Sequence, residues 1–482
     1  MNAFLRSLCQ SAWLTPLLVT AATLIASNAQ AGTIVVDWQG TGDYETIQEG
    51  IDAASDGDVV EILPGTYSGP GNRDVDFDGR RITVAASGAV TVDCGGSSSE
   101  HHRGFIFESG EDTTAVLQGV TIQNGYSTSG AGIYCGGSSP TLRNVSLLNC
   151  TGTTGGALFL GISDAVIEDI HISNATGTYG GGIHGENAWF TIRGGSIEDC
   201  YATAGGGIYL KYGSELTVRD LTISRCEANP SAGYGGGISL PDGVTLELED
   251  CVIEDCDGGM VGGGICCASA FGSEVSLTSV VISGCSACNG AGISAYMGTY
   301  ALEDVTIHDN TASSSGGGLL LRWVDLTAAR VTLSENLAGL DGGGAFLEAI
   351  DEGSVSRFTI VENTAPAGGA GLVLDDVSID VANCIFVGNN AGGPCVCEGA
   401  ATPNLIHNLS WSNAGGNDLC GSAASLLVED PLFCDGEYTL HDTSPCLPSG
   451  NAWGEHLGAH GIGYCGQPVE PSSWGQLKAM FR

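Results

Sequence analysis

Three aspartates near the N-terminus have the types and spacing of metal ligands. Asp74, Asp76 and Asp78, followed by Gly79, give the pattern D-x-D-x-D-G, which opens many Ca²⁺-binding loops. Position twelve of such a loop is Ala85 here, whereas an EF-hand places a bidentate Glu there. The segment then continues as the strand-like run RRITVA. Two interpretations remain: Ca²⁺ bound by Asp74, Asp76 and Asp78, or a structural turn.

Histidines offer general acid-base or metal chemistry, but their spacing keeps them apart. His171 and His308 fall on outward strand positions about five repeats from each other, so they cannot share a site. His101 and His102 lie together in a loop. None has the spacing to another His or Cys that a zinc site requires. The sequence therefore identifies no catalytic residue and predicts no firm cofactor.

Arginines recur at matching repeat positions. Arg330 and Arg357 occupy one turn position in successive repeats, and Arg193 and Arg219 do so one residue earlier, near Glu168. Each pair could form a small basic spot that holds an anionic substrate. The other interpretation is ion pairing between neighbouring repeats, which contributes little at a surface.

The elements that would position these side chains belong to one long repeat. A tetrad of small residues ending in an apolar or small one recurs at intervals of 25 to 30 residues. It begins at Gly130, Gly155, Gly180, Gly205, Gly235, Gly262, Gly290, Gly316, Gly342 and Gly369. Between tetrads, apolar and polar residues alternate in short runs, as in LTVRDLTISRC (216–226). Short strands joined by tight bends at this period predict a parallel β-helix of about twelve or more coils.

Two columns of equivalent residues support this architecture. The bend column is Gly119, Asn144, Asp169, Gly194, Asp220, Asp250, Ser279, Asp304, Arg330, Arg357 and Asn383. Gly, Asn and Asp tolerate left-handed backbone, so its aspartates are expected to form turns and not a catalytic series. The column that closes each coil is Gly125, Cys150, Ala175, Cys200, Cys226, Cys256, Cys285, Asn310, Asn336, Asn363, Asn389 and Asn413. We expect a ladder of mostly free thiols followed by a ladder of stacked amides.

The two ends differ from the repeats, as end-capping coils do. Thr46 to Ala54 places Ile47, Ile51 and Ala54 on one helical face, which predicts a short helix over the open end of the stack. Near the other end, Cys434 and Cys446 flank a short closing loop and are the expected disulfide.

Residues 1–31 read as a signal peptide, with Arg6 in a charged start, an apolar stretch at 14–26 and the cleavage motif Ala29-Gln30-Ala31. The expected domains are 1–31 signal peptide, 32–466 β-helix and 467–482 linker and short tail. No later segment could span a bilayer as a helix, so export predicts a secreted, cell-surface or outer-membrane protein. An even count of 18 cysteines would remain, which suits an oxidising compartment.

The net charge of the chain limits the classes of partner that it can bind. Cleavage removes Arg6 and no acid, leaving 55 acids against 14 Lys and Arg, a net charge of −41. Nucleic acid needs basic surface and is excluded as a partner. Anionic polysaccharides are disfavoured unless cations bridge them.

The opening GDYETIQEGIDAASDGDVVEILPGTY and the closing DPLFC…SPC resemble the pectin-lyase-like right-handed β-helix superfamily. The GGGI tetrads with IHDN, LSEN, IVEN and FVGN resemble the repeats of polymorphic outer-membrane proteins. The first resemblance implies the fold. It leaves function open, because this fold carries lyases, esterases, glycosidases, adhesins and spacers.

The pectic-enzyme set of Asn-Thr-Asp, Asp-Asp, His-Gly and Arg-x-Lys elements is missing, and Asp375-Asp376 stands without the other elements. The sequence favours a non-catalytic exported protein that presents a lateral surface for adhesion or for recognition of an extracellular glycan or cell-surface partner. The alternative is a polysaccharide lyase or glycoside hydrolase acting on an extracellular glycan, with loops such as 126–130, 227–233 or 266–273 assembling its site.

Overall fold

The computed structural model describes residues 31–268, 271–420, 425–434 and 436–463. The chain divides into two units, Met1–Ala31 and Gly32–Arg482, and the account below concerns the second unit alone. The predicted signal peptide, apart from Ala31, and the predicted tail at 467–482 lie outside the described residues.

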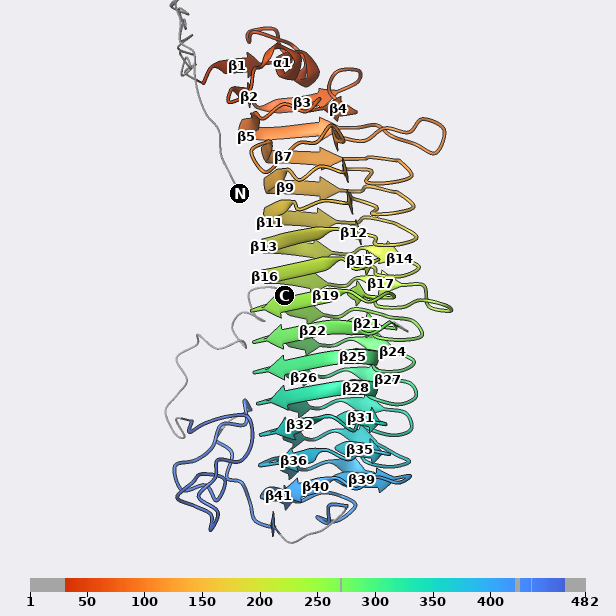
Figure 1. Cartoon of the computed structure of the whole chain (residues 1–482), viewed down its shortest axis with the longest axis vertical. Helices are drawn as coiled ribbons and strands as arrows, with labels where there is room; N and C mark the ends of the chain where they lie inside the picture. The colour runs from red at the N-terminus through yellow and green to blue at the C-terminus, as the bar shows by residue number, and fades with distance from the viewer. Residues whose placement is uncertain (1–30, 269–270, 421–424, 435, 464–482) are drawn as a thin grey trace, which may run out of the picture. The chain divides into compact units, whose positions relative to one another are not determined.

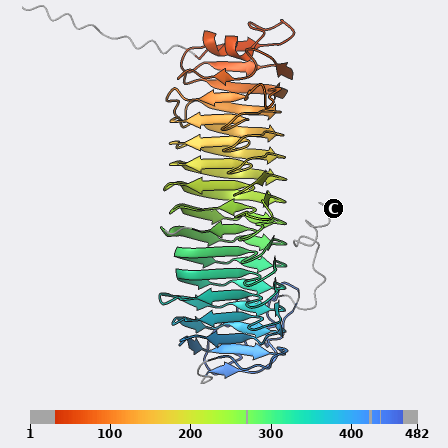
Figure 2. The same cartoon turned by 90° about the vertical axis from the view of Figure 1, so that its right-hand side faces the viewer.

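The second unit is a right-handed parallel β-helix of about 14 turns, which confirms the predicted fold class (Figure 1). Each coil passes through three strand faces, which we call faces A, B and C in chain order, and returns through a short loop edge. All ladders between successive coils are parallel, and Figure 2 shows the same stack from the side. None of the described helices is long and apolar enough to cross a membrane.

The strands fall into groups by face. Face A holds β4 (Val75–Asp76), β6 (Phe105–Phe107), β8 (Ile133–Gly136), β10 (Leu158–Gly161), β12 (Ile183–Glu186), β15 (Ile208–Lys211), β18 (Ile238–Ser239), β21 (Ile265–Cys267), β31 (Ala345–Glu348), β35 (Leu372–Asp375) and β39 (Cys395–Glu398). Two strands run from face A into face B: β25 (Ile293–Glu303) and β28 (Leu319–Ala329). Face B holds β1 (Thr33–Val36), β2 (Val59–Ile62), β19 (Thr245–Glu249), β22 (Ser273–Thr278), β32 (Gly353–Ser356), β36 (Asp380–Ala382) and β40 (Asn404–Ile406).

Further strands continue around the coil. Six run from face B into face C: β5 (Thr83–Asp93), β7 (Val116–Gln123), β9 (Thr141–Leu148), β11 (Val166–Ser173), β13 (Trp189–Glu198) and β16 (Glu215–Ser224). Face C holds β3 (Gly65–Ser68), β20 (Val252–Glu254), β23 (Val281–Ser283), β26 (Thr306–His308), β29 (Thr332–Ser334), β33 (Thr359–Val361), β37 (Ile385–Val387), β41 (Asn408–Trp411) and β42 (Leu426–Leu427). The loop edge holds β14 (Tyr201–Ala202), β17 (Glu227–Ala228), β24 (Ser286–Ala287), β27 (Thr311–Ala312), β30 (Leu337–Ala338), β34 (Thr364–Ala365) and β38 (Asn390–Ala391).

The period-two alternation in the sequence fixes which side chains fill the interior. Register pairs like with like: Ile133, Leu158, Ile183 and Ile208 follow one another on face A, and all four are fully buried. Because the inward residues of every coil stack on their equivalents, the core is one continuous apolar column.

The corner between faces B and C confirms the predicted bend column. All eleven of its residues, from Gly119 to Asn383, have φ between 49° and 77°. Left-handed backbone at one residue per coil turns the chain from one sheet to the next. The aspartates of this column are therefore corner residues.

The closing column also behaves as predicted. Cys200, Cys226, Cys256 and Cys285 are buried free thiols, and burial is the main reason why the pKa of Cys256 is raised. From Asn310 onward the amides form a ladder in which each Nδ2 donates to the Oδ1 of the next coil, at 3.0 Å for Asn310 to Asn336 and 2.9 Å for Asn389 to Asn413.

The N-terminal end is covered by the predicted helix, α1 (Ile47–Ala53) (Figure 1). Thr46 caps it, and Thr46 and Glu49 form a reciprocal capping box. Ile47 and Ile51 are fully buried against the first coils. The helix thus hides the apolar end of the column.

At the other end the chain folds back along face C. The segment 428–463, drawn in dark blue in Figure 1, packs on the outside of β29, β33 and β37. His460 Nε2 lies 2.7 Å from Thr332 Oγ1, and the backbone N–H of Ala459 donates to Thr359 Oγ1 at 2.9 Å. Outward-facing Ile385 is therefore buried beside Leu457.

The disulfide predicted between Cys434 and Cys446 is wrong. Cys446 is a buried free thiol, and Cys434 is disulfide-bonded, hence not to Cys446. Fold-back places Cys446 inside the C-terminal apolar cluster, away from solvent. A second disulfide joins Cys397 of β39 to Cys420, across 23 residues.

Candidate recognition surface

The three candidate Ca²⁺ ligands each contact protein groups. Asp74 lies 2.6 Å from His102 Nδ1 and accepts the backbone N–H of Arg103. Asp76 accepts the N–H of Asp78, and Asp78 pairs with a neighbouring arginine. Among the described residues no group of three His, Cys, Asp or Glu side chains is placed to hold a metal ion. Ca²⁺ at Asp74, Asp76 and Asp78 stays a prediction.

The arginine positions serve ion pairs between coils. Arg330 pairs with Glu303 and Asp304 of the coil before it, with 2.6 Å between its Nε and Asp304 Oδ1. Arg219 pairs with Glu249 of the next coil at 2.7 Å. Glu168 pairs with Arg143, again one coil away. The predicted basic spots at Arg330 and Arg219 are therefore largely neutralised.

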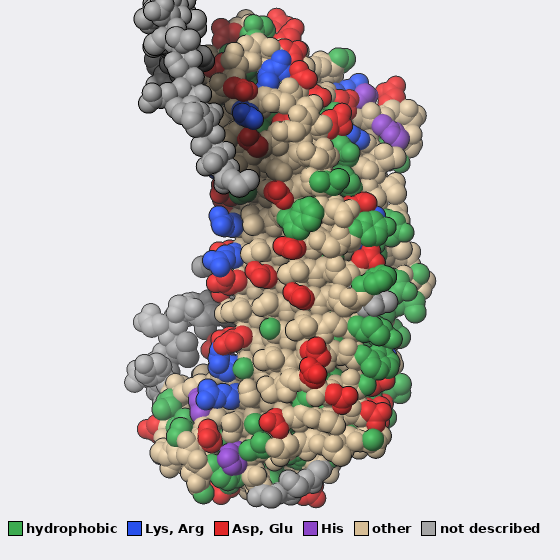
Figure 3. All heavy atoms as spheres, viewed as in Figure 1, with side chains coloured by type: hydrophobic (Ala, Val, Ile, Leu, Met, Phe, Trp, Pro, Cys, Tyr) green, Lys and Arg blue, Asp and Glu red, His purple; other side chains and the backbone are tan. Residues whose placement is uncertain are grey.

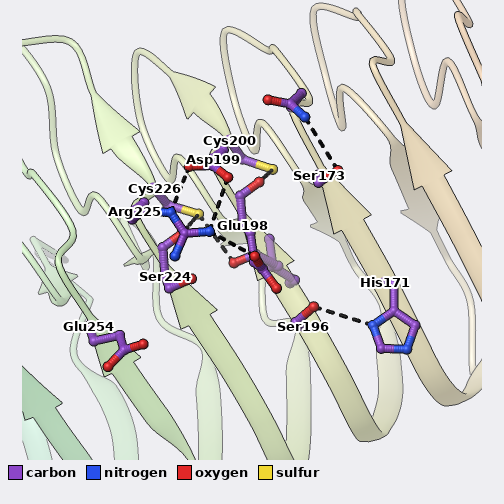
Figure 4. Close-up of polar contacts among 12 residues, drawn as sticks. His171, Ser173, Ser196, Glu198, Asp199, Cys200, Ser224, Arg225, Cys226 and Glu254 are labelled. Atoms are coloured by element: carbon purple, nitrogen blue, oxygen red, sulfur yellow. Dashed lines mark hydrogen bonds and ion pairs between the residues drawn. The ribbon is translucent and has the colours of Figure 1, made fainter. Parts of the chain in front are cut away.

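Face C repeats this arrangement at its far corner (Figure 4). Arg225 approaches Asp199 of the previous coil through Nε at 2.8 Å and Nη2 at 3.0 Å, and Glu198 through Nη2 at 2.7 Å. These acid partners raise the pKa of Arg225. His171 contacts only Ser196 in this view, at 3.3 Å and well away from Arg225. Several outward residues drawn are joined across coils by hydrogen bonds and ion pairs, whereas Cys200 and Cys226 are buried.

An aromatic ladder occupies the outward side of face A. Tyr134, Phe159, His184 and Tyr209 stack coil on coil, with ring centroids 5.1 to 5.5 Å apart. His184 is completely buried, and burial lowers its pKa to about 4. Its Nδ1 lies 3.2 Å from the carbonyl oxygen of Tyr179, while Nε2 has no hydrogen-bond partner. Because the rings stack on one another, the ladder stabilises the fold and leaves few free ring faces.

The corner between faces A and B carries exposed apolar side chains. Six of them share this edge: Ile162, Trp189, Tyr212, Phe271, Tyr296 and Trp323, here called the aromatic corner. Exposure reaches 82% at Phe271, 67% at Ile162, 52% at Tyr212 and 47% at Trp323. In Figure 3 hydrophobic side chains gather along one edge of the described unit at the height of β15 to β28, beside a broad polar face. Apolar side chains that gather along one edge of a surface in this way are typical of an interaction site.

Backbone conformation makes the aromatic corner costly. Ile162, Tyr212 and Trp323 have φ of 50°, 58° and 53°, in the left-handed region. Branched and bulky residues avoid this region, at roughly 1–2 kcal/mol each. Asn187, Met297, Ala349 and Asp376 occupy the equivalent position in other coils, all with left-handed backbone. The left-handed conformation is required by the corner, and the large exposed side chains at these positions are the feature that a binding role would use.

A pocket of about 580 Å³ opens on the aromatic corner. Tyr212 and Phe271 line it from two coils that are separated by one more coil. The intervening coil contributes Gly243, and Asp242 and Glu274 bring carboxylates. Lys211 Nζ lies 4.5 Å from the Tyr212 ring centroid and pairs with Glu186 at 3.2 Å, so the cation supports the ring.

Sequence reasoning missed the aromatic corner, although a signal existed. If the last residue of each tetrad is counted as the first, the fifth residue is large and apolar in four repeats and small or polar in the others. The four are Ile162, Tyr212, Met297 and Trp323, and the others are Gly137, Asn187, Asp242, Ser269, Ala349 and Asp376. The loop 266–273, named from sequence as a possible site former, does contribute Phe271. Asp375-Asp376, in contrast, ends β35 and forms a corner, where Asp376 accepts the N–H of Ala400.

Comparison with known proteins places the chain by architecture. Residues 131–312 match the family model described as right handed beta helix region. No curated protein shows significant sequence similarity to this chain.

Several solved structures are similar over most of their length. The A-module of mannuronan C-5 epimerase AlgE6 from Azotobacter vinelandii is 12% identical, covers 80% of this chain and 93% of its own, with a TM-score of 0.34. PfbA, a surface adhesin of Streptococcus pneumoniae, is 11% identical, covers 76% and 86%, with a TM-score of 0.38. A mannuronic acid specific polysaccharide family 6 lyase from human gut microbiota is 11% identical, covers 83% and 87%, with a TM-score of 0.29. Likeness at these levels supports no statement about function.

Proposed function

We propose that this chain is an exported, non-catalytic recognition protein whose aromatic corner binds an extracellular glycan. The observation that carries the proposal is the pair Tyr212 and Trp323, large aromatic side chains held exposed on left-handed backbone where Asn187 and Asp376 stand in other coils. Aromatic rings bind sugars by packing against their C–H groups, so exposed rings along one rigid edge suit a carbohydrate chain.

Two further features support a location outside the cytoplasm. The signal-peptide pattern at 1–31 and the disulfide between Cys397 and Cys420 support an oxidising destination outside the cytoplasm. The resemblance of the GGGI tetrads to polymorphic outer-membrane protein repeats supports secretion or display at the cell surface. A rigid stack of coils would there hold the aromatic corner toward its ligand.

A polysaccharide panel with a matched pair of variants tests the proposal. Tyr212→Asn together with Trp323→Asn removes both rings and installs a residue that already fits this position at Asn187. Tyr234→Ser is the control, since Tyr234 is an exposed tyrosine on the loop edge. We expect the wild type and the control to bind at least one insoluble polysaccharide, and the double variant to lose binding. Equal binding by the double variant would refute the proposal.

The same panel distinguishes the enzymatic alternative. A polysaccharide lyase would release unsaturated uronates, and a glycoside hydrolase would release reducing ends. Reproducible release that disappears in a variant of this surface would replace the non-catalytic proposal with the enzymatic one. Binding without release is the result that we expect.

A further inference from the structure

We infer that the pocket between Tyr212 and Phe271 is a subsite for one sugar of a neutral hexose chain. This inference rests on the proposed function and adds the ligand class. It is built on spacing, on the charge of the pocket and on the shape of its floor.

The number of coils between Tyr212 and Phe271 sets the distance between them. Thr245 of β19 is in register with Glu215 before it and Glu274 after it, so Tyr212 and Phe271 stand two coils apart. Two rises of ~4.8 Å give about 10 Å, which accommodates a pyranose ring between two aromatic rings in contact with it. The coil between them has Asp242 and Gly243 at the corner and no large side chain.

The floor of the pocket is glycine. Gly213, Gly243 and Gly272 line it in three successive coils. A side chain added at Gly243 would meet the carbonyl oxygen of Gly272 at 2.7 Å, so the floor is tightly built as well as flat. Glycine floors let a ligand approach the backbone closely.

The negative charge of the pocket disfavours the binding of acidic sugars. The pocket contains the carboxylates of Asp242 and Glu274 and no basic lining residue among those described. Lys211, which precedes Tyr212 in the same coil, is engaged by Glu186 and by the Tyr212 ring. Carboxylates accept hydrogen bonds from sugar hydroxyls and repel uronates, so the fitting ligand is uncharged.

The aromatic corner extends beyond the pocket. Tyr296 and Trp323 form an edge-to-face pair 4.8 Å apart in the next two coils. These rings offer further aromatic contacts to a glycan that occupies the pocket.

Calorimetric titration of the mature protein with matched oligosaccharides tests this subsite. The neutral probes are cellohexaose, mannohexaose and laminarihexaose, and the anionic probe is an oligogalacturonate of equal length. We expect saturable binding of at least one neutral probe and none of the anionic probe. Phe271→Ser and Asp242→Ala should each weaken neutral binding by about tenfold or more, while Tyr234→Ser leaves it unchanged.

The outcomes separate the subsite from the broader proposal. The subsite is overturned if the protein prefers the anionic probe. It is also overturned if neither Phe271→Ser nor Asp242→Ala weakens the binding of the neutral probes. If no neutral probe binds but polysaccharide retention still depends on Trp323, the subsite is wrong and the proposed function stands. If no glycan binds at all, both are wrong. Circular dichroism and thermal melting of each variant show that a loss is not due to unfolding.

Discussion

Asn336 donates from Nδ2 to Oδ1 of Asn363, 3.0 Å away in the next coil of the interior. The same Nδ2 donates to the carbonyl of Ile307 at 2.9 Å, and the Oδ1 of Asn336 accepts from the backbone and side chain of Asn310. One buried amide therefore joins three coils. Such a group satisfies backbone atoms that would otherwise be buried without a partner.

Replacing this amide should be costly. Asn336→Ala leaves buried donors and acceptors unpaired in both neighbouring coils, so we expect the free energy of unfolding to fall by about 3 kcal/mol. Asn404→Ala is the control, because exposed Asn404 contacts only Asp380, and its cost should stay near 0.5 kcal/mol. Urea unfolding measures both. Similar midpoints for the two variants would contradict the structural role of the ladder.

The aromatic corner should behave in the opposite way. Tyr212→Asn relieves left-handed strain and removes little packing, so stability should stay unchanged or rise by roughly 1 kcal/mol while glycan binding falls. Thermal melting and the binding panel are measured on the same preparation. A loss of stability of the size seen for a buried aromatic would show that the ring serves the fold.

The buried imidazole of His184 predicts a specific loss of stability in acid. Its pKa is lowered by burial from 6.5 to about 4. Above pH 6.5 the ring is neutral in both states, and as the pH falls from 6.5 toward 4 the unfolded ring binds a proton that the folded ring refuses. The free energy of unfolding should fall over this window by up to roughly 3 kcal/mol.

His184→Phe keeps a stacked ring and removes the titration, so it is the matched variant. The difference in unfolding free energy between wild type and His184→Phe should shift in favour of the variant between pH 7.5 and pH 4.5. Parallel pH profiles for the two proteins would contradict the assignment.

Cysteine mapping should divide the thiols by position. After denaturation without reduction, Cys200, Cys226, Cys256 and Cys285 should react with an alkylating agent. Cys397, Cys420 and Cys434 should react only after reduction. Peptide mass spectrometry distinguishes the two groups. Alkylation of Cys397 or Cys434 without reductant would contradict the disulfides of the structure.

The sequence was informative wherever one coil constrains the next. Inward positions such as Ile183 and closing positions such as Asn310 repeat because stacked coils demand like residues, so both columns and the bend column were predictable. Outward positions carry no such constraint. Cys446 is a free thiol because the non-repetitive segment folds back and buries it, and nothing in a repeat pattern reports that fold-back.

The aromatic corner was hidden for a related reason. A single apolar residue per coil adds no periodic signal to an alternating strand, and Tyr212 reads as one more residue between strands. Its significance appears only when its backbone conformation and exposure are known. The proposed binding surface therefore lies at outward positions that vary between coils, whereas the fold rests on inward positions that repeat.

α1 covers the N-terminal end of the column, and the non-repeating segment 428–463 packs on the outside of face C, while the coils of the middle section pair with their neighbours in the same parallel way. Duplication of a single 25- to 30-residue unit in the middle section would therefore add one position to the corner and leave both of these segments in place. The valency of this surface can thus change by whole coils, independently of stability at the termini. Under the proposed function, length variants of such a chain would differ in how many corner side chains they present to a ligand.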